Sequence, residues 1–156
     1  MTRIKFTQLA CSLFPPTISQ SLRNIIYPRE LGIKQKIEFS RKSITGSSFE
    51  SNTEDFHGFP FLFHGFFDWR NIIIANSIFK NKKGDIVEIG ANIGTETISY
   101  RDIVNKKGNV HAFEPLPKNF ICLKKISTKH KNLLVYQNAI SNNKGEISFL
   151  VPPPTS

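Results

Sequence analysis

The segment that most constrains the fold lies mid-chain, where an apolar run leads into two glycines. Residues 85–90 are mostly apolar and end at Gly90, which predicts a buried strand entering a tight turn. A helical pattern follows over residues 93–104, with Gly94 near its start. Such a turn points backbone N–H groups and the positive end of the helix dipole into one crevice. The segment therefore predicts a strand–turn–helix unit that binds a ligand.

The alternation of strands and helices continues downstream. The pattern predicts strands at 110–113 and 133–136, with a helix beginning at Pro117 between them. A turn at 142–145 would lead into a further strand at 146–151. Alternation of this kind, with nearly continuous apolar strands, predicts an α/β fold with a parallel sheet flanked by helices.

Two segments precede this core. Residues 1–54 form a weakly patterned N-terminal extension, helical or irregular, with a short amphipathic helix expected around residues 18–26. That helix could rest on a membrane surface, although we expect it to pack on its own domain. Residues 55–80 form an aromatic-rich segment ending in a predicted helix at 69–79. The predicted core occupies residues 81–156.

Composition sets limits on the class of protein. The net charge of +9 is spread along the chain rather than gathered in blocks, so we expect solubility rather than nucleic-acid binding. Cys11 and Cys122 lack the spacing of a metal or redox pair. The apolar stretch at the N-terminus is short and interrupted, and no run is long enough to span a bilayer. A cytoplasmic location is expected, with peripheral membrane contact left open and the oligomeric state undetermined.

The spacing of acidic residues and glycines narrows the class of ligand that the turn could bind. The dinucleotide fingerprint needs glycines where Asn92 and Thr95 stand, and no Walker A lysine is present. What does fit is an acid, a glycine, and a glycine four residues later, at Glu88, Gly90 and Gly94. Glu114 ends the second strand, where a carboxylate can accept both hydroxyls of a ribose.

Three stretches together carry a family resemblance: GDIVEIGANIGTETISY, VHAFEPLPKNFICLKKI and VYQNAISNNKGEISF. Across residues 82–151 the chain resembles the FkbM-type methyltransferases. The resemblance implies a class I, Rossmann-like methyltransferase fold, with S-adenosyl-L-methionine as methyl donor. It also implies O-methylation of a hydroxyl on a sugar, glycan or natural product.

The resemblance implies roles for particular residues. Residues 90–92 and Gly94 would line the methionine and ribose, Glu114 would hold the ribose diol, and Asn138 would lie near the adenine. The full set of candidate cofactor-binding residues is Glu88, Gly90, Ala91, Asn92, Gly94, Thr95, Glu96, Glu114 and Asn138. Structural explanations stay open for some: Glu96 suits a helix N-terminus and Asn138 suits a turn.

No catalytic residue is predicted with a definite role. A hydroxyl acceptor benefits from a general base, and His57 and His64 lie in the aromatic segment, which could cover the cofactor as a lid. No metal site is expected there, because no third ligand accompanies the two histidines.

The predicted core holds four strands, fewer than the resemblance implies, and then a proline-rich end. We therefore expect a C-terminally truncated domain whose activity is uncertain, with an open sheet edge. Two alternatives remain. One is a non-catalytic cofactor-binding or interaction module, and the other is an RNA methyltransferase, which the basic net charge would suit.

Overall fold

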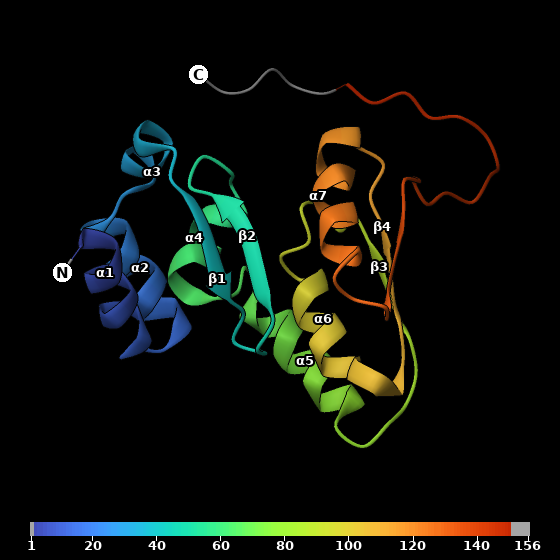
Figure 1. Ribbon diagram of the computed structural model, residues 1–156, viewed down its shortest axis with the longest axis horizontal. Helices are drawn as coiled ribbons and strands as arrows, with labels where there is room; N and C mark the ends of the chain where they lie inside the picture. The colour runs from blue at the N-terminus through green and yellow to red at the C-terminus, as the bar shows by residue number, and fades with distance from the viewer. Residues whose placement is uncertain (1, 151–156) are drawn as a thin grey trace.

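The computed structural model describes residues 2–150, apart from the side chain of Lys106, and these form an N-terminal part and an α/β part (Figure 1). The N-terminal part comprises α1 (Arg3–Ser12), α2 (Pro16–Ile26), α3 (Arg29–Gln35), β1 (Glu38–Lys42), β2 (Ser48–Asn52) and α4 (Gly58–His64). The α/β part comprises α5 (Trp69–Phe79), β3 (Ile86–Ile89), α6 (Thr97–Val104), the short 3₁₀ helix η1 (Asn105–Lys107), β4 (Val110–Phe113), α7 (Pro117–Ser127) and β5 (Leu133–Tyr136).

A parallel sheet in the order β3-β4-β5 confirms the α/β prediction. Ile86 pairs with Val110, and Val110 pairs in turn with Leu133, so the three strands start level. Because the strands are parallel and in step, all three carboxyl ends meet at one edge of the sheet. The turns that follow β3 and β4 therefore lie side by side.

Helices α6 and α7 cover one face of this sheet. Val110, Ala112 and Leu123 are fully buried there, together with Val104 of α6. The opposite face behaves differently: Val87 and Ile89 of β3 are 62% and 66% exposed. Within residues 2–150, no helix covers that face, so the strands are buried on one side rather than on both.

The N-terminal part has a core of its own, built from aromatic side chains of the 55–80 segment. Phe59 and Phe63 of α4 are at most 2% exposed, and Tyr27 packs against both. Phe61 of the same helix instead packs with Ile93 and Ile98, in an apolar cluster shared with the α/β part. The antiparallel hairpin β1–β2 lies on the same helix. The extension was expected to be helical or irregular, and the hairpin within it was not expected.

Two predicted bounds are wrong. Helix α6 begins at Thr97 rather than at residue 93, because Asn92 and Gly94 have φ of 51° and 96°, outside the helical region. Residues 146–150 form no strand; Phe149 is 50% exposed and no neighbouring strand offers hydrogen bonds. Val151, the last residue of that predicted strand, and the proline-rich end lie outside the described residues.

One carboxylate ties the hairpin turn to α6. Asp102 accepts hydrogen bonds from the backbone N–H of Ser47 (2.8 Å), the Ser47 hydroxyl (2.6 Å) and the Thr45 hydroxyl (2.9 Å). Arg101 also contacts it and reaches the Ser47 hydroxyl at 2.7 Å. This network joins the two parts of the chain through polar groups.

Replacing Asp102 with alanine is expected to lower the free energy of unfolding by about 2–4 kcal/mol, because several donors to a charged acceptor lose their partner. Urea denaturation followed by circular dichroism measures the change. The matched control is Glu54→Ala, which breaks the exposed Lys36–Glu54 pair and should cost about 1 kcal/mol or less. Equal losses in the two variants would contradict the role assigned to Asp102.

Candidate cofactor site at the carboxyl edge of the sheet

The turn after β3 is held by the end of β4. The carbonyl of Phe113 accepts hydrogen bonds from the backbone N–H groups of Gly90 (2.9 Å) and Ala91 (3.0 Å). Gly90, Asn92 and Gly94 all have positive φ, so the backbone winds tightly through this turn. The turn is thereby fixed at the carboxyl edge, where ligands of open α/β sheets bind.

Glu114 extends this attachment by one residue. One carboxylate oxygen accepts the backbone N–H of Asn92 and the other accepts that of Leu116, both at 2.9 Å. The residue is only 5% exposed. Each oxygen keeps a lone pair for a further donor, so the carboxylate is oriented and still able to accept a hydroxyl.

The two glycines of the turn have different surroundings. A Cβ built on Gly90 meets no atom within 4 Å, so open space lies above this residue. A Cβ on Gly94 would come within 2.7 Å of Ile126 and 3.0 Å of Leu123, both in α7. Gly90 therefore leaves room for a ligand, whereas Gly94 allows α7 to approach the turn.

The side chains of the other residues predicted for the site differ in exposure and in hydrogen-bond partners. Ala91 and Thr95 are 2% and 0% exposed, so their side chains point into the protein. Glu96 accepts hydrogen bonds from the Thr95 hydroxyl (2.7 Å) and from the backbone N–H of Asp68 (3.2 Å). Asn138 is exposed, two residues beyond β5, on the same edge of the sheet.

Glu88 lies beneath the turn, on the helix-covered face of β3. Its carboxyl group accepts a hydrogen bond of 2.6 Å from the Thr97 hydroxyl. Burial, with a smaller contribution from Glu96, raises the pKa of Glu88 to about 8 despite that bond. Glu88 is therefore largely protonated at neutral pH.

The aromatic segment contacts the glycine turn through His57. His57 lies with Nε2 2.9 Å from the Asn92 side-chain nitrogen, and its ring stacks on Phe67 at 4.1 Å between centroids. Because the amide nitrogen donates, Nε2 accepts and the proton sits on Nδ1, which is buried with no partner among the described residues. This arrangement suits a residue that positions Asn92 better than a general base.

His64 is remote from the turn. It is 8% exposed, beside Ser19 and Arg23, and burial lowers its pKa to about 4. Asp68 was missed from the sequence, although an aspartate directly before a predicted helix is a recognisable N-cap. Its backbone contact with Glu96 depends on the tertiary fold.

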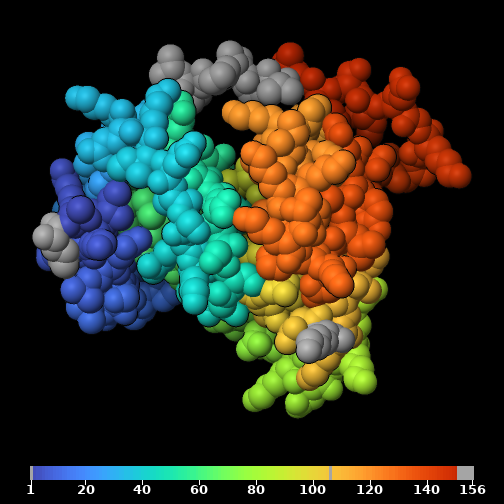
Figure 2. Space-filling model, viewed as in Figure 1, coloured from blue at the N-terminus to red at the C-terminus, as the bar shows by residue number. Residues whose placement is uncertain are grey.

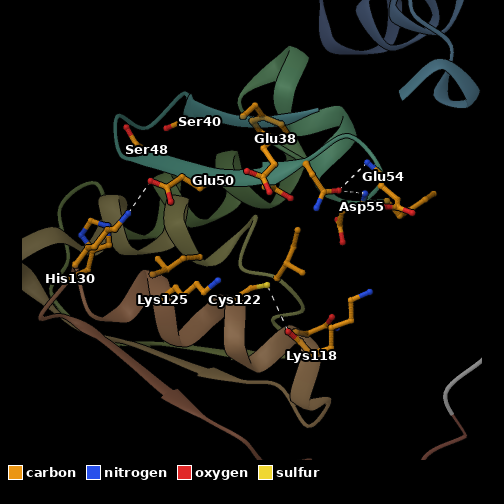
Figure 3. Close-up of a pocket in the computed structure, with 18 of the residues that line it drawn as sticks. Glu38, Ser40, Ser48, Glu50, Glu54, Asp55, Lys118, Cys122, Lys125 and His130 are labelled. Atoms are coloured by element: carbon orange, nitrogen blue, oxygen red, sulfur yellow. Dashed lines mark hydrogen bonds and ion pairs between the residues drawn. The ribbon is translucent and has the colours of Figure 1, made fainter. Parts of the chain in front are cut away.

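A cavity of about 800 Å³ lies between the hairpin and α7 (Figures 2 and 3). Carboxylates line the hairpin side and its continuation, whereas lysines line the α7 side; the principal groups are Glu38, Glu50, Asp55, Lys118, Lys125 and Lys129. Lys129 and Glu50 form an ion pair of 2.9 Å across it. The cavity reaches Phe56, next to His57, so one end approaches the glycine turn.

A parallel sheet with a glycine turn after one strand and a buried acid ending the next defines a Rossmann-like α/β domain. Residues 88–156 match a family model described as the methyltransferase FkbM domain. This match over the C-terminal part of the chain confirms the resemblance seen in its sequence. No curated protein sequence matches the chain.

Residues 2–150 contain neither a membrane-spanning helix nor a metal-binding cluster. No helix among them is long and apolar enough to cross a membrane. No group of three or more histidine, cysteine, aspartate or glutamate side chains there could hold a metal ion.

The protonation of Glu88 predicts a pH dependence of stability. Its folded-state pKa, about 8, exceeds the ordinary value of 4.5, so the folded state holds a proton that the unfolded state has lost between these values. The stabilisation is full below pH 4.5 and is lost as pH rises to about 8, at up to about 1.4 kcal/mol per pH unit.

The measurement is urea denaturation at several pH values for wild type and Glu88→Gln. The glutamine keeps the shape of the protonated acid, so it should remove the loss of stability between pH 6.5 and pH 8. This range lies above the one in which the lowered pKa of His64 contributes an opposite slope. The control, Glu50→Gln, changes an exposed acid and should leave the loss of stability as in wild type. A wild-type curve that is flat between pH 6.5 and pH 8 would refute the assignment.

Proposed function

We propose that this domain binds S-adenosyl-L-methionine at the glycine turn and transfers its methyl group to a hydroxyl of a sugar, glycan or natural product. The match of residues 88–156 to the methyltransferase FkbM domain carries the proposal. Open space above Gly90 and an oriented carboxylate at Glu114 support it.

The residues present fit such a cofactor. Glu114 would accept the ribose hydroxyls with its remaining lone pairs, while its bonds to Asn92 and Leu116 keep it fixed. Gly90 would allow the methionine portion to lie close to the backbone, and Asn138 would border the adenine. The cofactor supplies an activated methyl group, so the protein's main task is to position the acceptor.

The cavity between the hairpin and α7 is the place we propose for the acceptor. Its volume is in the range of small-molecule sites, and its Phe56 end adjoins His57. Carboxylates and lysines together suit a polar, hydroxyl-bearing molecule. Because the carboxylates offset the basic side chains of the lining, the cavity offers no net positive field to a polyanion, which weighs against an RNA acceptor.

Calorimetry with S-adenosyl-L-methionine tests the cofactor site through two matched glycine variants. Gly90 and Gly46 both have positive φ, and a Cβ on either meets nothing within 4 Å, so alanine strains both positions similarly. Only Gly90→Ala places a methyl group in the proposed ligand space. It should weaken binding by about tenfold or more, and Gly46→Ala should not.

Glu114→Gln gives a second arm of the calorimetry. It retains the side-chain shape but removes the charge that would face the ribose, so binding should again weaken by about tenfold. Equal affinity in all variants, or no binding by the folded wild-type chain, would refute the cofactor site. Binding without methyl transfer to any hydroxyl acceptor would favour the non-catalytic alternative.

A further inference from the structure

In α1 and α2 the usual pattern of burial in a globular domain is reversed. In α1 the buried residues are Thr7 and Cys11, at 0% and 4% exposure, and in α2 the buried residue is Ser19, at 2%. Large apolar side chains point outward instead: Phe6, Leu9, Leu13, Phe14, Ile18 and Ile25 are between 47% and 78% exposed. Small polar groups are inside and large apolar groups are outside.

These exposed side chains are arranged on defined sides of the helices. Phe6, Leu9 and Leu13 recur at three- and four-residue spacing, so they share one side of α1. Ile18 and Ile25, seven residues apart, share one side of α2. The two helices pack against each other at the end of the molecule far from the parallel sheet (Figure 1). We call these six residues the apolar end.

Charge around the apolar end has one sign. Arg3 and Lys5 of α1 are exposed, and no acidic residue precedes Glu30. Two other basic residues, Arg23 and Arg29, turn toward the Phe59 ring of the N-terminal core instead. Lys5 is exposed on α1 among the apolar residues. Apolar side chains with basic ones and no acid are the composition of a surface that binds anionic lipid.

We propose that the apolar end docks on the surface of a membrane containing anionic lipid. Helices of 10 and 11 residues are too short to span a bilayer and would lie in its interface. Leu13 and Phe14, at the turn between the helices and 72% and 47% exposed, are placed to enter the acyl region first.

A second copy of the chain is a poorer occupant. A two-fold interface through the apolar end would bring Arg3 and Lys5 of both copies close together, and no acidic residue within residues 2–29 could pair with them. A membrane with anionic headgroups would bury the apolar side chains and attract the basic ones.

Vesicle co-sedimentation of the full chain tests the proposal. Vesicles of phosphatidylcholine containing about 30% phosphatidylglycerol should bind the protein, and pure phosphatidylcholine should bind it much less. Raising the salt concentration should weaken binding without abolishing it, since apolar insertion is not screened. The double variant Leu13→Glu, Phe14→Glu should reduce partitioning by about tenfold or more.

The matched control adds the same charge elsewhere. Ile44→Glu with Ile140→Glu changes two apolar residues that are 57% and 49% exposed outside the apolar end, and should bind vesicles nearly as wild type does. Because all four positions are exposed, circular dichroism should show both variants folded. The proposal fails if wild type ignores anionic vesicles, if the two double variants lose binding equally, or if Leu13→Glu, Phe14→Glu only dissociates a dimer.

Discussion

The attachment of one turn to the neighbouring strand determines much of what this domain can do. Phe113 and Glu114, at the end of β4, bind three consecutive backbone N–H groups of residues 90–92. The turn is therefore set by hydrogen bonds from a strand distant in sequence, and its shape depends on the register of the parallel sheet. A slip between β3 and β4 would remove all three bonds together. The register of the parallel sheet therefore also sets the geometry of the candidate site.

The sequence predicted best the elements whose patterns are local. The helix at 69–79 and the strands at 110–113 and 133–136 have the predicted bounds, because an apolar run and a flanking cap or turn define each one. The hairpin was missed because Glu38–Lys42 and Ser48–Asn52 are largely polar and lie half-exposed. Helix α4 was missed because nearly all its residues are buried, so it lacks an amphipathic period. The strand expected at 146–151, which is not formed over residues 146–150, depends on a pairing partner that periodicity does not supply.

For the candidate site, spacing predicted positions but could not predict their surroundings. Gly90 and Glu114 were found from the order of acids and glycines along predicted elements. That Gly94 faces α7 rather than open space, and that His57 contacts Asn92, depends on how segments distant in sequence pack. The reversed exposure of side chains in α1 and α2 could not be predicted either. The helical spacing of Ile18 and Ile25 predicts that they share one side of a helix, but it does not indicate what covers that side. We had expected that side to face the domain.

The contact of Gly94 with α7 restricts the substitutions that this fold can accept during evolution. A side chain at position 94 would displace Leu123 and Ile126, and α7 begins three residues after Glu114. Moving the helix would therefore also move the carboxylate that holds the turn. Among related sequences, a residue larger than glycine at this position should occur only with smaller residues at positions 123 or 126. We therefore expect the three positions to covary, because loss of the glycine would need compensation at the residues that it contacts.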